Sequence, residues 1–440
     1  MKIWKLLVFA FITQLSAKEM DPVFLDQLRG DTNTMVTALI TRSKPLREVS
    51  PTDPQLAIAD LKVRSAVLHQ EIARTFERFT GAIPQMTDIW LADTVIVNAP
   101  VGVWREAIDF FEDKKISADH TVELIQPVES KRVREDSADK TTYGVARIRA
   151  QEVWKDFGVT GEGIRVGVID SGWSNHPDLE GKILLSKDFT GETSGLEPND
   201  TMGHGTHCMG IIGGGNASGK SIGAAPGVKF IVARIFGKEK TTLSIVLKAM
   251  QWIADPDGDH TTNDGPHIIS NSWGSIAQTY LWQPTLRWKK LLGILPVFAA
   301  GNRGPRKRSM AAPGGYPHVI AVGATDSKDD MGSFSSRGPS FYYRKRYTKP
   351  DLSAPGVDVF SAYIDESQYR NWSGTSMATP FVAGTAALVM EANPSLSVYE
   401  VEKILLNSTI DYGSPGKDNH YGMGRIDAYL AVEKALSLQK

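Results

Sequence analysis

The feature that most restricts the fold is a run of small and apolar residues at positions 381–389, FVAGTAALV. It carries no charge, and a helix built from it is apolar on nearly every side, so it must be enclosed by other elements. Pro380, directly before the run, is expected in the first turn of this helix, where its missing N–H is tolerated. The chain must therefore build a large core around this segment.

The rest of the C-terminal two thirds alternates short apolar runs with helical patterns. Strands are predicted at 165–169, 229–234, 268–270, 294–299 and 319–322, and helices around His204, over 242–254, from Ser376 and from Ser397, which forms a capping box with Glu400. Such alternation predicts an α/β fold with a mostly parallel sheet covered on both faces, in three layers.

Composition permits this core and says little about charged partners. The chain has 440 residues, 41% of them apolar and 22% charged, which is more than one ordinary domain needs. The formal net charge is −1, so nothing indicates nucleic acid as a partner.

Ser376 lies in the motif GTSMATP at positions 374–380, at the expected start of the apolar helix. Backbone N–H groups at a helix start stabilise an anion formed there. A serine becomes a nucleophile only with a base and a carboxylate to orient it. Asp170 directly follows the predicted strand at 165–169, and His204, in GHGTHCMG, is expected to be exposed at the head of a small-residue helix.

With these motifs the sequence resembles the subtilisin-like serine proteases, or subtilases, from about Tyr143 to the end. The shared motifs, in the family's order, are VIDSG at 168–172, HGTH at 204–207, SNSWG at 270–274, AAGN at 299–302 and GTSMATP at 374–380. The resemblance implies a secreted endopeptidase in which Asp170, His204 and Ser376 form the catalytic triad and the Asn302 side chain binds the oxyanion.

Substrate contacts also follow from the resemblance. It implies that protein or peptide substrates bind along Ser272, Trp273 and Gly274 on one side and along Ala300 and Gly301 on the other. Ala311 is expected near the base of the pocket for the residue before the scissile bond. The cations Arg303 and 306–308 either repel basic side chains of a substrate or form an ordinary solvated loop.

A structural calcium ion is a further implication of the resemblance, with Asp139 and Asp178 as ligands beside the loop at 214–221. Ala217 stands where the family has a side-chain oxygen. The same loop, GGNASGKS, has the spacing of a phosphate-binding loop, but a helix is expected before it and Pro226 follows it, so we exclude nucleotide binding. No cofactor is expected for catalysis.

Cys208 is the only cysteine, so the chain forms no internal disulfide. It follows His204 by four residues and is therefore expected on the same helix face. This placement resembles the thiol-bearing subtilases of the proteinase K type. His207 is interpreted as structural, and a metal site of His204, His207 and Cys208 stays a weaker alternative because its spacing matches no zinc signature.

The N-terminal sequence predicts export. Residues 1–17 carry two lysines, an apolar run at 6–12 and a small residue at Ala17 before a cleavage site, which is typical of a signal peptide. The apolar run is too short for a membrane anchor. The mature protein is therefore expected to be secreted or periplasmic.

Residues 18–138 are expected to form a propeptide, and residues 139–440 the peptidase domain. A strand at 34–40, a helix at 60–79, one or two strands at 89–98, a helix at 103–111 and a last strand at 121–126 predict a small β-α-β-β-α-β domain. The stretch 129–140 is rich in charged and small residues and suits an exposed linker, which we expect the enzyme to cut near 135–142.

Two classes of function remain open at this point. The first is an active endopeptidase made as a self-processed zymogen. The second is a catalytically silent subtilase scaffold that binds peptides, which the presence of Asp170, His204, Asn302 and Ser376 disfavours.

Overall fold

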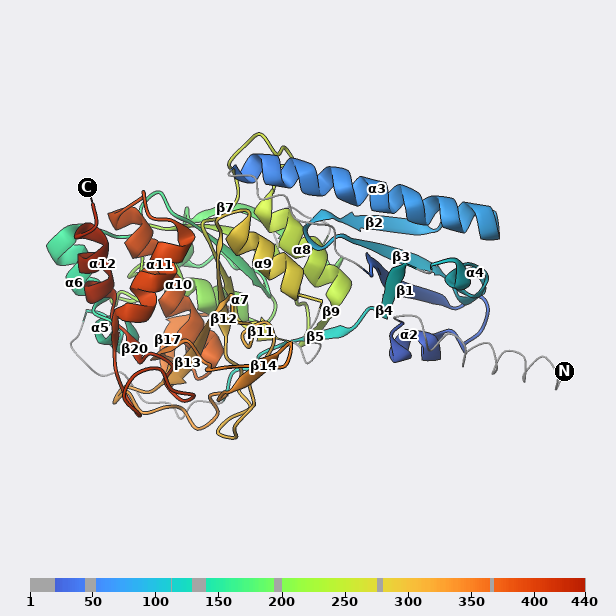
Figure 1. Ribbon diagram of the computed structural model, residues 1–440. Coiled ribbons are helices and arrows are strands. Elements are labelled where there is room, and N and C mark those ends of the chain that lie inside the picture. Colours follow the sequence, from blue (N-terminus) through green and yellow to red (C-terminus); the bar gives the residue numbers. More distant parts are fainter. Residues whose placement is uncertain are drawn as a thin grey trace. The chain divides into compact units, whose positions relative to one another are not determined.

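The computed structural model describes residues 20–43, 53–111, 113–128, 140–193, 200–274, 280–364 and 368–439. The chain divides into two units, residues 1–120 with 242–251, and residues 121–241 with 252–440 (Figure 1). The expected signal peptide and most of the expected linker lie outside the described residues.

The first unit is a small α+β fold around a four-stranded antiparallel sheet. Its strands are β1 (Met35–Arg42), β2 (Gln85–Ile89), β3 (Thr94–Pro100) and β4 (Lys114–Ala118), in the order β2-β3-β1-β4. Helix α3 (Pro54–Thr80) follows β1, α4 (Val101–Ala107) lies between β3 and β4, and the short α2 (Pro22–Gln27) precedes them. The predicted β-α-β-β-α-β order is confirmed.

The last strand of that pattern was wrongly placed. The sheet closes with β4, whose Ile116 pairs with Ile40 of β1 and is 1% exposed, whereas residues 121–124 form β5 in the other unit. Strand β4 begins with two lysines and contains only a few apolar residues, so its sequence shows no clear strand pattern. The core of the small unit centres on Trp104, whose ring lies edge-on to Phe24 and Phe76 at 5.0 and 5.3 Å.

The second unit is built on a nine-stranded sheet of order β19-β20-β16-β13-β12-β10-β6-β8-β7. The strands are β6 (Arg165–Asp170), β7 (Ile183–Asp188), β8 (Lys229–Arg234), β10 (Ile268–Asn271), β12 (Leu295–Ala299), β13 (Ile320–Thr325), β16 (Leu352–Pro355), β19 (Thr409–Ile410) and β20 (Arg425–Ile426). All neighbours pair in parallel except β19 with β20. The predicted α/β fold with a mostly parallel sheet is confirmed.

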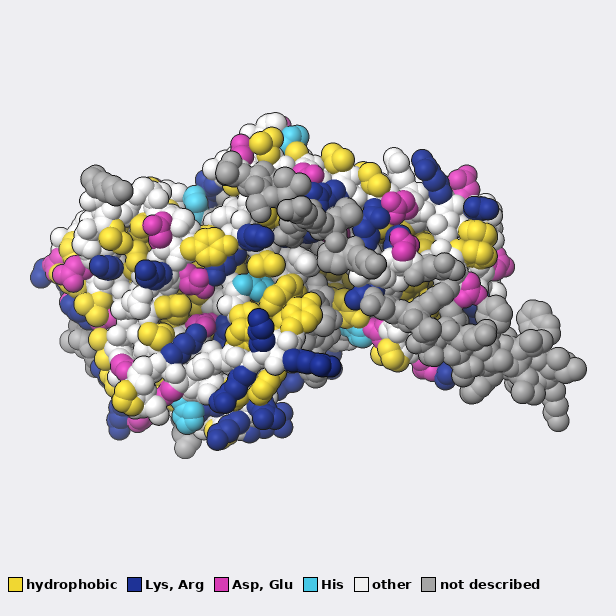
Figure 2. Space-filling view, in the orientation of Figure 1, with side chains coloured by type: hydrophobic (Ala, Val, Ile, Leu, Met, Phe, Trp, Pro, Cys, Tyr) yellow, Lys and Arg dark blue, Asp and Glu magenta, His cyan; other side chains and the backbone are white. Residues whose placement is uncertain are grey.

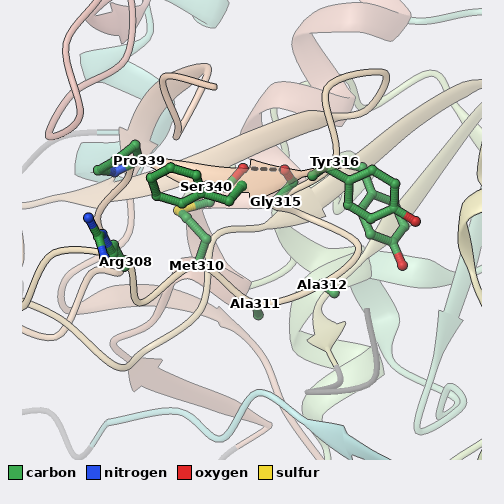
Figure 3. Close-up of a pocket in the computed structure, with 10 residues that line it drawn as sticks. Arg308, Met310, Ala311, Ala312, Gly315, Tyr316, Pro339 and Ser340 are labelled. Carbon is green, nitrogen blue, oxygen red and sulfur yellow. Dashed lines mark hydrogen bonds between the residues drawn. The ribbon is translucent and has the colours of Figure 1, made fainter. Parts of the chain in front are cut away.

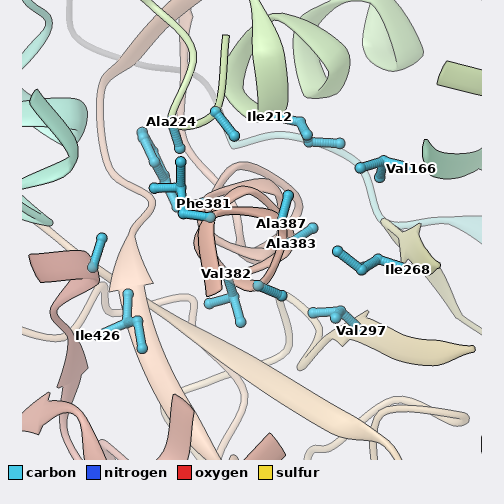
Figure 4. Close-up of a cluster of buried hydrophobic side chains, with 14 of the residues drawn as sticks. Val166, Ile212, Ala224, Ile268, Val297, Phe381, Val382, Ala383, Ala387 and Ile426 are labelled. Atoms are coloured by element: carbon cyan, nitrogen blue, oxygen red, sulfur yellow. The ribbon is translucent and has the colours of Figure 1, made fainter. Parts of the chain in front are cut away.

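Helix α10 (Thr375–Ala392) is the apolar helix expected from the sequence and lies at the centre of the core. Figure 4 shows it end-on, with Phe381, Val382, Ala383 and Ala387 among side chains of the sheet and of neighbouring helices, including Val166, Ile212, Ile268 and Val297. Gly384 is required, because a Cβ there would lie 2.7 Å from the Cβ of Ala224. Pro380 is the sixth residue of the helix, so its expected place in the first turn is wrong.

Seven further α-helices follow α4 in the described residues besides α10. They are α5 (Tyr143–Arg147), α6 (Ala150–Phe157), α7 (His204–Gly213), α8 (Leu243–Ala254), α9 (Trp282–Lys290), α11 (Val398–Asn407) and α12 (Ala428–Leu436), with most of α8 grouped in the first unit. The capping box of Ser397 and Glu400 at α11 is confirmed. Among the described residues, no helix has the length and apolar character needed to cross a membrane.

Smaller sheets complete the second unit. Strand β11 (Trp273–Gly274), β5 (Thr121–Leu124) and β9 (Lys240–Thr242) form a three-stranded sheet with β5 in the middle. Two hairpins follow, β14 (Ser340–Tyr342) with β15 (Lys345–Tyr347) and β17 (Val359–Ala362) with β18 (Tyr369–Trp372). The residues just before the expected linker are therefore part of the same unit as Ser376.

Candidate active site

Asp170 and His204 meet at the carboxyl end of β6. The Nδ1 atom of His204 lies 2.8 Å from a carboxylate oxygen of Asp170, and both side chains are 1% exposed. Since an ionised carboxylate only accepts hydrogen bonds, Nδ1 carries the proton and Nε2 is left as a base. The expected exposure of His204 is wrong, because the Trp372 ring packs 6.1 Å from its imidazole and Cys208 lies on its own helix beside it.

The start of α7 is fixed by groups that the sequence reasoning missed. One carboxylate oxygen of Asp200 accepts the N–H of Gly203 and the hydroxyl of Ser171, and the other accepts the N–H and hydroxyl of Thr206. Gly205 allows the helix to approach the end of β6, because a Cβ at this position would lie 2.2 Å from the carbonyl oxygen of Gly172. These contacts hold His204 against Asp170.

Electrostatics suit a base at His204. Burial lowers the pKa of the imidazole, but the Asp170 charge opposes it and the pKa is raised well above 6.5. His207, one turn along, behaves differently: burial lowers its pKa to about 3, and its Nε2 lies 2.9 Å from the carbonyl oxygen of Arg370. It therefore stays neutral and structural in this fold.

Ser376 is the second residue of α10 and is fully buried. Its hydroxyl lies 3.0 Å from the carbonyl oxygen of Ile125 and 3.3 Å from that of Ser272. The Nε2 atom of His204 has no hydrogen-bond partner among the described residues. The hydroxyl therefore faces the segment at 121–128, and the bond to the base that nucleophilic attack needs is not made in this state.

The helix position of Ser376 explains why Cys208 and Ser272 lie beside it. Pro380 lacks the N–H that would otherwise bond to the carbonyl of Ser376 four residues earlier. That carbonyl instead accepts the hydroxyl of Ser272 at 3.0 Å and the thiol of Cys208 at 3.5 Å. Burial raises the pKa of the Cys208 thiol, which keeps it protonated as a donor.

Asn302 follows β12 and presents its amide to the same cleft. Its Oδ1 accepts the N–H of Thr375 at 3.0 Å and the Thr375 hydroxyl at 2.9 Å, and the same hydroxyl accepts the N–H of Gly301 at 3.0 Å. The Nδ2 atom is thereby turned outward and donates to the carbonyl oxygen of Gln126 at 2.8 Å. Sequence reasoning missed Thr375, although it directly precedes Ser376.

Residues 121–128 run through this cleft as a peptide. Leu124 and Glu123 pair antiparallel with Trp273 and Gly274, and the N–H of Val128 donates to the carbonyl of Ser373 at 2.7 Å. The Ser376 hydroxyl faces the carbonyl of Ile125, whereas Asn302 binds the carbonyl one residue later. No carbonyl of this segment has both groups, so the segment is bound out of register for attack.

The predicted substrate residues divide into two sets. Gly274 and Gly301 line a cavity of about 400 Å³ with Asn302, Ala311 and the 123–128 segment. A Cβ at Gly274 would lie 2.9 Å from that of Ala311, so glycine is needed for these two walls to approach each other. The other three do not line it: Ser272 bonds to the Ser376 carbonyl, the Trp273 ring packs on Phe298 at 5.4 Å, and Ala300 bonds through its backbone to Val322 and Ala311.

Of the two predicted calcium ligands, Asp139 and Asp178, the structure describes only Asp178. Asp139 lies outside the described part of the chain. The carboxylate of Asp178 accepts the N–H of Ala217 at 2.7 Å on one oxygen and the hydroxyl of Tyr369 at 2.8 Å on the other, and it belongs to no cluster of three or more potential metal ligands among the described residues. A different acidic cluster lies in the loop after α8, where carboxylate oxygens of Asp255, Asp257 and Asp264 lie within 4.8 Å of one another.

Comparison with known proteins agrees with this geometry. The model of the Subtilase family, peptidase family S8, matches residues 161–424, more than half of the chain. The chain therefore belongs to the subtilase family and is a subtilisin-like serine endopeptidase.

Three curated relatives illustrate the extent of the match. Serine protease AprX of Bacillus subtilis is 39% identical over 306 residues, which cover 62% of this chain and 67% of that protein. Subtilisin BL of Lederbergia lenta is 34% identical over 297 residues, covering 67% of this chain and all of that protein. Bacillopeptidase F of Bacillus subtilis is 31% identical over 415 residues, 85% of this chain but only 28% of that longer protein.

Proposed function

We propose that this endopeptidase cuts peptide bonds with Ser376 as nucleophile, His204 as base, Asp170 as its orienting carboxylate and Asn302 in the oxyanion hole. The observation that carries the proposal is the 2.8 Å contact between Asp170 and His204 Nδ1, which leaves Nε2 as a base on the helix beside Ser376. The raised pKa of His204 supports the same role.

The reaction follows from these positions. The Ser376 oxygen attacks the substrate carbonyl as its proton passes to Nε2 of His204, and Asp170 stabilises the resulting imidazolium. The oxyanion accepts hydrogen bonds from Nδ2 of Asn302 and from the backbone N–H of Ser376. His204 then gives its proton to the leaving amine, and water, deprotonated by the same imidazole, releases the acyl group and regenerates the Ser376 hydroxyl.

We further propose that the chain is made as an exported zymogen, with residues 1–17 as signal peptide, 18–138 as propeptide and 139–440 as peptidase. Support comes from the small α+β unit and from residues 121–128, which occupy the cleft with Ile125 only 8% exposed. Because this segment diverts the Ser376 hydroxyl, substrates are excluded until the linker is cut near 135–142. Cleavage by the enzyme itself then releases a secreted or periplasmic peptidase.

Self-processing can be tested with the precursor of Ser376→Ala. We expect this protein to keep its N-terminal unit during purification and to be cut when a trace of mature wild-type enzyme is added. Maturation of the purified variant without added enzyme would contradict self-cleavage.

A likeness to the proteinase K type is proposed only for Cys208. Its sulfur lies 3.9 Å from Nδ1 of His204, so a mercurial bound to the thiol would displace the imidazole. We expect mercury compounds to abolish activity and Cys208→Ala to be insensitive. Full activity of the wild type with stoichiometric bound mercury would contradict this arrangement.

A structural calcium ion is proposed on family grounds alone, since Asp139 lies outside the described residues and Asp178 belongs to no described cluster of potential ligands. Strong chelation is expected to lower the melting temperature of the mature protein if an ion is held elsewhere in the chain. An unchanged melting temperature would remove calcium from the account.

Hydrolysis itself is the test of the proposed roles. Mature wild-type protein should cleave an internally quenched peptide, and Ser376→Ala should fall to the level of the buffer blank. If the wild type cleaves no peptide while still binding it, the chain is instead a silent subtilase scaffold.

A further inference from the structure

An unusual concentration of cations lies beside the cleft. The loop after Asn302 contains Arg303, Arg306, Lys307 and Arg308, and the β14–β15 hairpin contributes Arg344, Lys345 and Arg346. All seven are exposed. The sequence has no acidic residue at 301–325 or at 331–350, although the whole chain has nearly equal numbers of both charges.

The loop and the hairpin form one surface, which we call the cationic surface. Arg308 stacks over the ring of Phe341 at 4.9 Å, and its N–H bonds to the carbonyl of Gly338. Figure 2 shows Lys and Arg side chains gathered over the region where β14 lies in Figure 1. Apart from Arg303, none of these cations makes an ion pair within the described residues.

The cationic surface is continuous with the peptide cleft. A pocket between loop and hairpin is lined by Arg308, Tyr316 and Phe341, and Ala311 lines both this pocket and the cavity whose wall includes residues 123–128. Figure 3 shows Arg308 and Tyr316 at opposite ends of this pocket, with Ala311 between them. A peptide bound in the cleft therefore lies next to unpaired positive charge.

One acidic side chain of the cleft segment forms ion pairs with cations beside the cleft. Glu123 of the cleft segment has one carboxylate oxygen 3.3 Å from Nη2 of Arg303 and the other 3.4 Å from Nζ of Lys240. Its backbone pairs with Gly274. The two cations flank the segment at this position, two residues before Ile125, so a substrate residue in the same place meets both.

We propose that Lys240 and Arg303 form a subsite that selects an acidic substrate residue, and that the cationic surface extends this selection to further acidic side chains of the same substrate. The inference rests on the proposed function, since it concerns the substrate of that site. It identifies the preferred substrates as acidic segments of proteins. The cations at 303–308 are therefore a specificity device as well as a solvated loop.

Peptide is favoured over nucleic acid as the occupant for two reasons. The anion that is seen between the cations is a glutamate side chain, and the surface shares a wall with a cleft built for extended peptide backbone. Tight, salt-dependent binding of single-stranded DNA by the mature enzyme, without any preference among peptides, would assign the surface to nucleic acid and overturn the proposal.

The test uses mature enzyme and three internally quenched peptides. Each begins with the sequence of residues 121–126 and continues with alanine and serine, with Glu, Gln or Lys in the place of Glu123. Exposed ion pairs are individually weak, so we expect kcat/KM for the Glu peptide to exceed that for the Gln peptide by about three- to tenfold at low salt, with the Lys peptide lowest. At about 1 M salt the ratio of kcat/KM for the Glu and Gln peptides should fall towards one, because charges are screened beyond about 3 Å.

Variants identify the cations responsible. Lys240→Gln with Arg303→Gln should abolish the preference for Glu, so that the variant cleaves the Glu and Gln peptides with equal kcat/KM. Arg306→Gln with Arg308→Gln should act only on peptides extended by four glutamates, compared with four glutamines. Lys434→Gln, an exposed lysine of α12, is the matched control and should change neither ratio.

Two results overturn the inference while leaving the proposed function intact. One is equal turnover of the Glu and Gln peptides by an active enzyme. The other is an equal loss on all three peptides in the Lys240 and Arg303 double variant, which would indicate a structural role. Failure of the proposed function looks different, since then no peptide is cleaved.

Discussion

Thr375→Val offers a sharp test of how the oxyanion site is built. The substitution keeps the shape of a fully buried side chain and removes one hydroxyl. That hydroxyl donates to Oδ1 of Asn302 at 2.9 Å and accepts the N–H of Gly301 at 3.0 Å. The Thr375 hydroxyl bonds to Asn302 and Gly301 and not to residues 121–128 of the cleft, so Thr375 is a positioning residue that acts through Asn302.

The magnitude follows from these two bonds. Loss of a hydrogen bond costs about 0.5–1.5 kcal/mol, and an unsatisfied buried N–H at Gly301 adds about 1–3 kcal/mol, so we expect a stability loss of about 1.5–4.5 kcal/mol. Asn302 keeps a second anchor in the N–H of Thr375. The fall in kcat should therefore be about 10- to 100-fold, less than the roughly 10²- to 10³-fold effect known for removing such a donor outright.

The assay is steady-state hydrolysis by the mature protein, with thermal unfolding measured in parallel. We expect a lower kcat with little change in KM, because the oxyanion forms only in the transition state. Thr375→Ser retains the hydroxyl and should stay within about threefold of wild type, as expected when the hydrogen bond is kept. A Val variant that loses stability but keeps wild-type kcat would refute the positioning role.

Three further predictions concern pH, a buried ion pair and the cleft segment. Because the pKa of His204 is raised, its imidazole stays protonated to higher pH, and the kcat/KM of the wild type should rise towards alkaline pH. In Asp170→Asn this rise should occur at lower pH. Profiles of kcat/KM against pH for the two proteins measure the shift. Burial raises the pKa of Asp329, but hydrogen bonds from Arg147 and Tyr412 outweigh this effect, so the pKa is lowered overall. Asp329→Asn should therefore lower the free energy of unfolding in urea by about 3 kcal/mol at neutral pH. The loss should become smaller as the pH falls and the wild-type carboxylate is protonated. In the Ser376→Ala precursor, Ile125→Asp should loosen residues 121–128, because it places a charge at a buried position. Faster proteolysis of this segment than in the Ser376→Ala parent would support the burial of Ile125. Equal rates would argue against it.

The sequence predicted those elements whose residues carry a periodic pattern. The central strands and the apolar helix follow from runs such as 229–234 and 381–389, which leave few alternatives. Strand β7 was missed because its side chains are half-exposed or exposed along most of their length and show no alternation. Strand β5 was assigned to the wrong sheet, since its partner Trp273 lies about 150 residues away and no local signal indicates the pairing.

The candidate site shows the same limit. Asp170, His204 and Ser376 stand in motifs of their own, so residue types and order sufficed to select them. Thr375 acts through Asn302, which lies far from it in sequence, and Asp200 acts through groups at the start of α7, such as the N–H of Gly203. No spacing in the sequence predicts these two roles. The calcium expectation at Asp178 stays a prediction, because Asp139 lies outside the described residues and no other described carboxylates cluster with Asp178.

The most direct test of the central claim is labelling with a serine-directed fluorophosphonate, followed by mapping of the adduct. The account predicts a single adduct at Ser376 in the mature protein, none in Ser376→Ala, and much slower labelling of uncut precursor, in which residues 121–128 hold the hydroxyl. An adduct on another serine, or equal labelling of precursor and mature protein, would contradict it.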